Sequence, residues 1–276
     1  MRKHMNWMVL SGALLCGMPA AHAGNGFSVG AGTNYSVGNY GTSTATDIWS
    51  TPFAASYQAK RWTFAVTVPY VRVSGSGNVI PGTGPVDKRD LLGGGLGGLL
   101  GDGSAANADV SRTRTSAAGL GDVVASAGYG LLANDDHSAG LALTGKIKFA
   151  TADARKGLGT GRNDYGLSLD GYKTWGQWTP FGGIGWTDYG SSRSIRLRSG
   201  ANANAGLDYR LQSRDNVGVS YNFRQRIVAG GAAQGEITTY WSHRFSDRFR
   251  LQGEALAGMT RGSPDWGVGT SVDYAF

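Results

Sequence analysis

Apolar and polar residues alternate along most of the chain, so that hydrophobic or aromatic side chains recur at every second position. In the stretch LALTGKIKFA at 141–150, the leucines, the isoleucine and the phenylalanine fall on one side of an extended strand, whereas Lys146 and Lys148 fall on the other. The same period predicts twelve strands, at about 27–37, 49–57, 62–70, 123–131, 141–150, 165–169, 178–186, 201–209, 217–223, 237–245, 249–259 and 266–276. We therefore expect an all-β chain.

The connections between the predicted strands alternate in length. Five are tight, at 59–61, 133–137, 176–177, 211–215 and 246–248. Those between them are longer, and include 151–162, 228–234 and more than forty residues after Tyr70. Outer-membrane barrels alternate short periplasmic turns with longer external loops, and single-chain bacterial barrels have an even number of strands. The sequence thus predicts a transmembrane antiparallel up-and-down β-barrel of about twelve strands, with a long external loop at about 72–118.

Aromatic residues gather at both ends of the predicted strands. One set flanks the short turns or the terminus: Trp62, Trp175, Trp178, Phe245, Phe249 and Phe276. The other flanks the long loops: Tyr35, Trp49, Tyr70, Tyr165, Trp186 and Trp266. Amphipathic rings favour the depth of lipid headgroups, so the sets predict two aromatic girdles. A secreted β-sandwich would share the alternation, but the girdles and the loop pattern favour the barrel.

The N-terminal segment has the composition of an export signal. Two basic residues precede an apolar run and an Ala-x-Ala site at Ala21 and Ala23, which predicts a secretory signal peptide at 1–23 and a mature barrel at 24–276. The single cysteine lies within this signal, so we expect a mature chain without thiols or disulfides. The predicted location is the bacterial outer membrane.

The C-terminal strand places Val272, Tyr274 and Phe276 on one face and ends on an aromatic ring. This arrangement resembles the recognition signal that outer-membrane barrels present to their assembly machinery. We therefore expect that machinery, together with outer-membrane lipid, among the partners of the chain.

Lysine is costly on the lipid face of a barrel, at about 2–4 kcal/mol near the bilayer midplane. The apolar residues of 141–150 must then face lipid, and Lys146 and Lys148 project into the lumen. The same register predicts further lumen-lining residues: Asp170, Asp208, Arg210, Arg224, Glu236, Arg244, Arg250, Glu254 and Asp273. Such an interior is either a salt-bridged filling or a polar pathway, and the pattern leaves both open. An excess of inward bases predicts mild anion preference in an open lumen.

Neither the composition nor the motifs indicate a nucleic-acid, nucleotide or metal site. The chain holds 46 glycines, 16% charged residues and a net charge of +7, without the arginine-rich runs of nucleic-acid binding. The glycine-rich stretch at 90–103 lacks the lysine of a phosphate-binding loop, and 156–164 fits a tight external turn better than a calcium site. We expect no metal and no cofactor.

Two histidines, His137 and His243, remain in the predicted mature chain. Ser242 adjoins His243, but neighbouring residues of a strand point to opposite faces. That pair therefore cannot form the dyad of an outer-membrane lipid hydrolase, and we expect no enzyme.

Several stretches resemble a known family. KIKFATADARKGLGTGRNDYGLSLD from 146, WTPFGGIGW from 178, SHRFSDRFRLQ from 242 and GSPDWGVGTSVDYAF from 262 are similar to the outer-membrane transporter family labelled MetA-pathway of phenol degradation. VPYVRVSGSGNVIPG from 68 and GLGDVVASAGYGLL from 119 match its earlier part, and Ala150 stands where many members have proline. The resemblance implies a barrel for uptake of aromatic or other small apolar compounds, without catalytic residues.

The function predicted from these features is passive uptake of small molecules through a monomeric outer-membrane channel. The first alternative is a structural or surface-interaction barrel whose lumen is plugged and whose loops carry the activity. An outer-membrane lipid hydrolase is the second.

Overall fold

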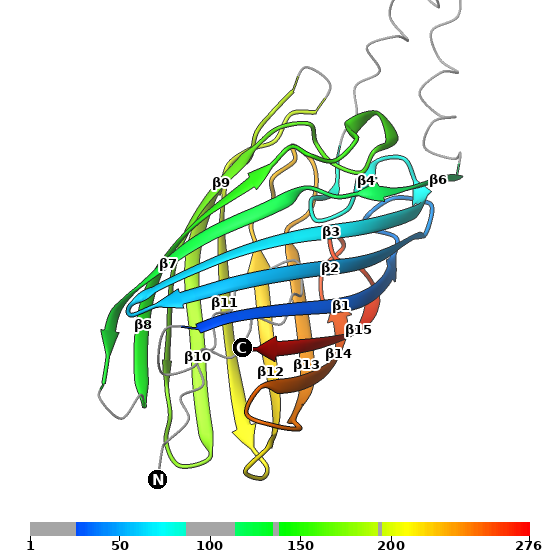
Figure 1. The fold of residues 1–276 in the computed structure, drawn as a ribbon. Coiled ribbons are helices and arrows are strands. Elements are labelled where there is room, and N and C mark those ends of the chain that lie inside the picture. The colour runs from blue at the N-terminus through cyan, green and yellow to red at the C-terminus, as the bar shows by residue number, and fades with distance from the viewer. Residues whose placement is uncertain (1–25, 87–113, 135–137, 193–194) are drawn as a thin grey trace, which may run out of the picture.

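The structure is a computed structural model that describes residues 26–86, 114–134, 138–192 and 195–276. Its strands wind into one barrel (Figure 1). They are β1 (Gly26–Gly38), β2 (Thr46–Ala59), β3 (Trp62–Ser76), β4 (Val79–Ile80), β5 (Gly84–Pro85), β6 (Arg114–Leu120), β7 (Val123–Ala133), β8 (Ala139–Phe149), β9 (Asp164–Lys173), β10 (Trp178–Asp188), β11 (Gly200–Arg210), β12 (Asp215–Arg224), β13 (Gln234–Arg244), β14 (Phe249–Gly258) and β15 (Trp266–Ala275).

Every neighbouring pair of wall strands is antiparallel, and the sheet closes on itself. β1 pairs with both β2 and β15, and β2 pairs with β3, which completes the ring. β6 and β7 pair in turn with β3 and form one wall strand interrupted at Gly121 and Asp122. The result is a closed barrel of 12 wall strands, as the sequence predicted, with β4 and β5 as a separate hairpin.

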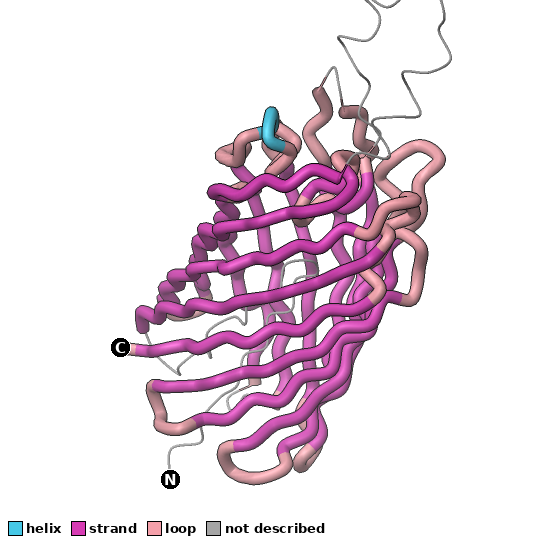
Figure 2. Tube along the Cα trace, turned by 90° about the vertical axis from the view of Figure 1, so that its right-hand side faces the viewer, coloured by secondary structure: helices cyan, strands magenta, loops and turns pink. Residues whose placement is uncertain are grey.

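The long and the short connections lie at opposite ends of the barrel, which Figure 2 shows in side view. The long ones join the strands at 39–45, 77–113, 150–163, 189–199, 225–233 and 259–265. The short turns lie at 60–61, 134–138, 174–177, 211–214 and 245–248, at the end where β1 begins and β15 ends. The alternation predicted from the sequence is confirmed, and the two ends are called here the loop end and the turn end.

One boundary differs from the prediction. β3 continues to Ser76 and β6 begins at Arg114, so the long connection spans 77–113 rather than 72–118. The apolar alternation ends before β3 does. The first outward position after Tyr70 is the exposed Arg72, so the apolar pattern underestimates the length of the strand. Residues 87–113, including most of the glycine-rich stretch at 90–103, lie outside the described residues.

The outer face of the wall is apolar. Large exposed hydrophobic side chains recur at alternate positions on the wall strands, such as Phe53 and Ile184, which are 55% and 67% exposed. Rings meet across neighbouring strands at both ends: Tyr35 lies 5.7 Å from Trp266 near the loop end, and Trp178 lies 4.4 Å from Tyr209 near the turn end. This is the two-girdle arrangement expected from the sequence.

The described residues contain a short 3-10 helix, Ala154–Lys156, in the connection between β8 and β9. Among the same residues, none of the helical structure is long and apolar enough to cross a membrane.

Candidate functional site

The wall of the lumen has a neutral side and a charged side. Along β1, β2, β3 and β7 the inward positions are mostly serine, threonine, alanine and glycine, and Ser28 and Ser56 share a 2.8 Å hydrogen bond there. From β8 to β15 the inward positions carry the ionisable side chains predicted from the sequence. Space for a solute would therefore be bounded by small neutral groups on one side and charges on the other.

Lys148 is held by an ion-pair cluster close to the loop end. Its Nζ lies 2.9 Å from carboxylate oxygens of both Asp122 and Asp164, and it donates to Thr160 Oγ1 at 3.2 Å. Asp122 also accepts from the backbone N–H of Ala152 at 3.0 Å. The lysine thus ties the interruption between β6 and β7 to the start of β9 and to the connection between β8 and β9.

Sequence reasoning placed Lys148 in the lumen but missed both of its acidic partners. Asp164 is paired directly with Lys148 in the register, and Asp122 lies in the interruption before β7. Each precedes an outward-facing residue, Tyr165 or Val123, so the alternation could have placed both inside. The predicted strands were begun one residue too late to include them.

Lys146 points to the same side as Lys148 and interacts electrostatically with Asp170. Asp170 is buried and accepts hydrogen bonds from Ser168 Oγ at 2.7 Å and Asn204 Nδ2 at 3.4 Å. The wall makes room for this carboxylate with Gly183, its partner in the register, because a Cβ there would collide with it. The wall therefore accommodates the Asp170 carboxylate through the absence of a side chain at Gly183.

The acids on the next strands also have partners. Asp208 on β11 accepts from Tyr240 Oη at 3.1 Å and from Asn216. Glu236 on β13 faces the charge of Arg224, and Glu254 on β14 lies 3.5 Å from Gln252 Nε2. These contacts bring the predicted inward acids into side-chain networks along the wall.

Arginines concentrate at the turn end of the charged side. Arg250 on β14 donates to Asp273 on β15 at 3.0 Å through Nη2. Arg244 on β13 is the direct register partner of Arg250, and Arg210 lies at the end of β11. The predicted inward residues therefore separate into an arginine-rich turn end and a mixed middle.

The inward charges do not show the expected excess of bases. Among the described residues, the inward bases are Lys146, Lys148, Arg210, Arg224, Arg244 and Arg250. The inward acids are Asp122, Asp164, Asp170, Asp208, Glu236, Glu254 and Asp273. The expectation of a basic lumen is wrong because it omitted Asp122 and Asp164, which neutralise Lys148 locally.

A hairpin from the connection after β3 reaches across the loop end. β4 and β5 form this hairpin, and its turn carbonyls at Gly82 and Thr83 both accept hydrogen bonds from the Arg224 guanidinium, the first at 3.1 Å. Arg224 ends β12, which lies six wall strands from β3 in either direction around the ring. The hairpin therefore crosses the mouth and is fastened to the opposite wall.

Gly84 allows the hairpin to lie close to that wall. Its φ is +86°, a backbone conformation suited to glycine, and a Cβ there would collide with the Gln234 amide. Gln234 is the register partner of Arg224 and donates to the carbonyl of Gly262 at 2.9 Å. The hairpin thus lies against the ends of β12 and β13, and Gln234 links β13 in turn to the connection before β15.

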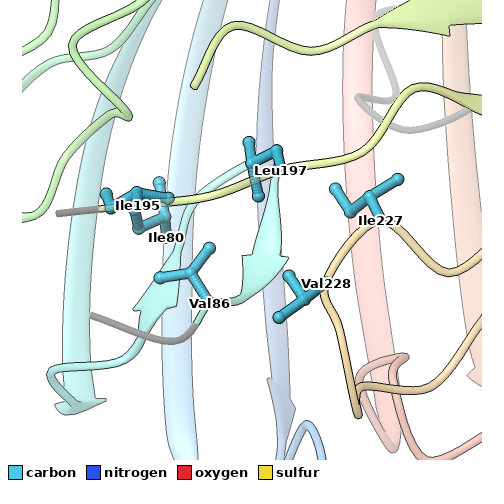
Figure 3. Packing of buried hydrophobic residues seen from close by; sticks show 6 residues of the cluster. All are labelled: Ile80, Val86, Ile195, Leu197, Ile227 and Val228. Carbon is cyan, nitrogen blue, oxygen red and sulfur yellow. The ribbon is translucent and has the colours of Figure 1, made fainter. Parts of the chain in front are cut away.

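Apolar side chains from three connections pack together beside the hairpin (Figure 3). This mouth cluster consists of Ile80, Val86, Ile195, Leu197, Ile227 and Val228. All six are buried, and Tyr189 packs against them with the Arg224 guanidinium 5.9 Å from its ring centre. Burial of this kind stabilises by about 25 cal/mol per Å² of apolar surface. Connections from opposite sides of the ring therefore hold each other over the lumen.

A smaller apolar cluster fixes the connection between β8 and β9. Leu158 and Ala152 of that connection pack on the inward Val71 and Val73 of β3. Sequence reasoning missed the two apolar clusters because their members lie in loops or beyond the alternating part of β3. No periodic pattern marks them.

The remaining predicted sites have mixed outcomes. Val272, Tyr274 and Phe276 all lie exposed on the outer face at the end of the chain. Ala21, Ala23, the signal peptide at 1–23 and His137 lie outside the described residues. His243 lies on the outer face of β13, 2.9 Å from Asp215. Its neighbour Ser242 points inward, as the argument against a hydrolase required. Among the described residues no group of three or more histidine or acidic side chains could hold a metal ion.

Comparison with known proteins identifies the fold. No protein-family model matches the chain, and no curated protein matches it in sequence. The MetA-pathway resemblance therefore stays a prediction. Among solved structures, the COG4313 outer membrane channel from Pseudomonas putida F1 is similar, with 16% identity, a TM-score of 0.64 and coverage of 95% of this chain and 100% of that one. The KdgM porin is also similar, with 10% identity, a TM-score of 0.52 and coverage of 90% and 99%. The chain thus has the fold of outer-membrane channels of known structure.

Proposed function

We propose that the chain is a passive outer-membrane channel for small solutes whose mouth is narrowed by the β4–β5 hairpin. The observation that carries this proposal is the closed barrel with a polar, charged inner wall, crossed at the loop end by a hairpin fastened to Arg224. In this orientation the loop end faces outward and the turn end faces the periplasm. The similar structures, a channel and a porin by their names, support the proposal through their fold.

The size and wall of the barrel suit a selective passage. Small eight-stranded barrels are filled by side chains, and barrels of 16–18 strands leave a wide aqueous channel. A barrel of 12 wall strands lies between these limits. The small serine, threonine and glycine residues of β1–β3 and β7 leave room along one side, so we place the path there. The predicted substrates are aromatic or other small apolar compounds, and the mouth cluster, whose side chains are buried, narrows the entrance that they would use.

The proposal includes the expected biogenesis of the protein. A signal peptide at 1–23 would export the chain, and the exposed aromatic end at Tyr274 and Phe276 would be read by the barrel assembly machinery. The mature barrel, 24–276, would work as a monomer in the outer membrane.

A specific observation also favours the alternative of a plugged barrel. The mouth cluster joins three connections into a buried apolar unit over the lumen, as a permanent closure would require. In that case the loops would carry the activity at the cell surface.

The deciding experiment is single-channel recording of refolded residues 24–276 in a planar bilayer. Discrete conductance steps support the channel. Silence from protein that migrates as a compact, heat-modifiable band on a gel overturns it and leaves the plugged barrel.

A further inference from the structure

Three adjoining connections at the loop end have a basic exposed side. They are the connections between β8 and β9, between β10 and β11, and between β12 and β13. The second adjoins the start of β9, because Gly190 N–H donates to Asp164 at 2.9 Å. It also adjoins the third, because Arg198 N–H donates to the Ile227 carbonyl at 2.8 Å. The exposed bases of these connections, called here the basic arc, are Arg155, Lys156, Arg162, Arg196, Arg198 and Arg226.

Acidic side chains are fewer than the bases of the arc. Among the described residues, the acids beside the arc are Asp153, which forms an ion pair within it, and the exposed Asp188 at the end of β10. Asp164, at the start of β9, is buried and forms its ion pair inside the lumen. The described parts of the other long connections hold one base and one acid, Arg261 and Asp265. Positive charge is therefore concentrated on one side of the ring.

The connections bury apolar side chains over the lumen and expose their bases on the other side. Burial alternates along 195–198, where the isoleucine and the leucine belong to the mouth cluster and both arginines are exposed (Figure 3). In the connection between β8 and β9, Leu158 packs on the inner side of β3, whereas the side chain of Arg155 is 93% exposed. The basic arc therefore faces the surroundings of the barrel on the side away from the mouth cluster.

The outer wall beside the basic arc is apolar. Tyr165 and Leu167 on β9 and Ile184 and Trp186 on β10 are all exposed on this face, and Trp186 is the register partner of Leu167. A lipid against this part of the wall would place its acyl chains on these side chains and its headgroup beside the arc. Clustered bases at headgroup depth attract anionic lipids, and guanidinium groups donate paired hydrogen bonds to phosphate oxygens.

We infer that the basic arc binds the phosphate groups of an anionic glycolipid of the outer leaflet. In the orientation proposed above, the loop end lies in that leaflet, where such a lipid combines acyl chains with a phosphorylated sugar headgroup. The inference rests on the proposed location in the outer membrane, and it needs no conduction. A lipid held by all three connections would also stabilise the mouth cluster on their inner side.

The test counts bound lipid by native mass spectrometry. The probe is lipid A with two phosphate groups, added to the folded mature barrel in detergent without divalent cations. Wild type is expected to retain lipid A, and R196Q/R198Q is expected to weaken binding by about tenfold, because charge-assisted hydrogen bonds to phosphate are lost. Lipid A that lacks one phosphate should bind wild type more weakly than the intact lipid. Added salt should weaken binding by screening.

The matched control is R61Q/R248Q, which removes the same charge from exposed positions at the turn end and should bind lipid A as wild type does. All four arginines are exposed, so both double variants should keep the compact, heat-modifiable band of the folded barrel.

Three results would overturn the lipid site: no binding to folded wild type, equal binding by wild type and R196Q/R198Q, or an equal loss in R61Q/R248Q. Displacement of lipid A by inorganic phosphate would assign the arc to free phosphate and would also overturn it. Conductance is not part of this test, so a barrel that binds lipid A but never conducts overturns the channel alone.

Discussion

Arginine has opposite roles at the two ends of this barrel. At the loop end, Arg224 is buried, stacks near Tyr189 and donates to two carbonyl groups of the β4–β5 hairpin. At the turn end, Arg244 and Arg250 are register partners on the neighbouring strands β13 and β14, and Arg250 donates to Asp273 on β15. A guanidinium that donates to buried backbone carbonyls fixes a loop, whereas one that donates to a carboxylate on the next strand joins two strands of the wall.

The surroundings explain the difference. The loop end is dry because three connections bury six apolar side chains beside Arg224, and hydrogen bonds there cannot be exchanged for bonds to water. The turn end has short turns with no comparable apolar cluster among the described residues. We therefore expect substitutions at the loop end to change stability and conductance more than substitutions at the turn end do.

The largest effect is expected from removal of the Arg224 guanidinium. R224M leaves the carbonyls of Gly82 and Thr83 without their donor, at a cost of about 2 kcal/mol in the free energy of unfolding. The hairpin should detach from the opposite wall, so single-channel steps should become severalfold larger. R226M is the matched control, because Arg226 is exposed and lies two residues further along, in the connection that follows β12. Unchanged steps in R224M would show that the hairpin does not limit the passage.

A somewhat smaller effect is expected from a side chain at Gly84. G84A introduces a Cβ at a positive φ and against the Gln234 amide, which together should cost about 1–2 kcal/mol. G230A separates the two causes, because Gly230 has a φ of +76° but nothing within 4 Å of its Cβ position. The variant G84A should therefore raise conductance and G230A should not. Larger steps in both variants would attribute the effect to general loop loosening.

The wall of the barrel was predictable from the sequence, but the arrangement over its mouth was not. Alternation fixes which residues face lipid because a lysine on that face is costly, so the inward position of Lys146 follows directly. The mouth cluster depends on packing among residues such as Ile80 and Ile227, which come from connections on opposite sides of the ring. No local period encodes such contacts. The sequence does not distinguish Arg224 from the other inward charges, although its guanidinium donates hydrogen bonds to two backbone carbonyls.

A third effect distinguishes the two lysines that the sequence treated as equivalent. K148M leaves Asp122 and Asp164 without the cation that lies 2.9 Å from each, and should lower the free energy of unfolding by about 2 kcal/mol. K146M leaves Asp170 its hydrogen bonds from Ser168 and Asn204, and should cost less than about 1 kcal/mol. Urea unfolding followed by tryptophan fluorescence measures both variants. Equal losses of unfolding free energy in K148M and K146M would mean that the ion-pair cluster around Lys148 stabilises the barrel no more than the interaction of Lys146 with Asp170.

The smallest effect concerns the dry packing of the loop end and is visible only in alkali. Tyr40, in the connection between β1 and β2, is buried, and its hydroxyl lies 3.3 Å from Ser36 Oγ. Burial raises the pKa of Tyr40 from 10.0 to about 12, against a smaller opposite effect of the Ser36 hydrogen bond. The folded state therefore keeps this proton longer than the unfolded state. Below pH 10 the side chain is neutral in both states, and stability is lost as the pH rises from about 10 towards 12. Y40F removes the titrating group, so the difference between the ultraviolet titrations of wild type and Y40F should show one tyrosine ionising near pH 12. Ionisation near pH 10 would mean that water reaches Tyr40, and that the loop end is not as dry as the contrast with the turn end requires.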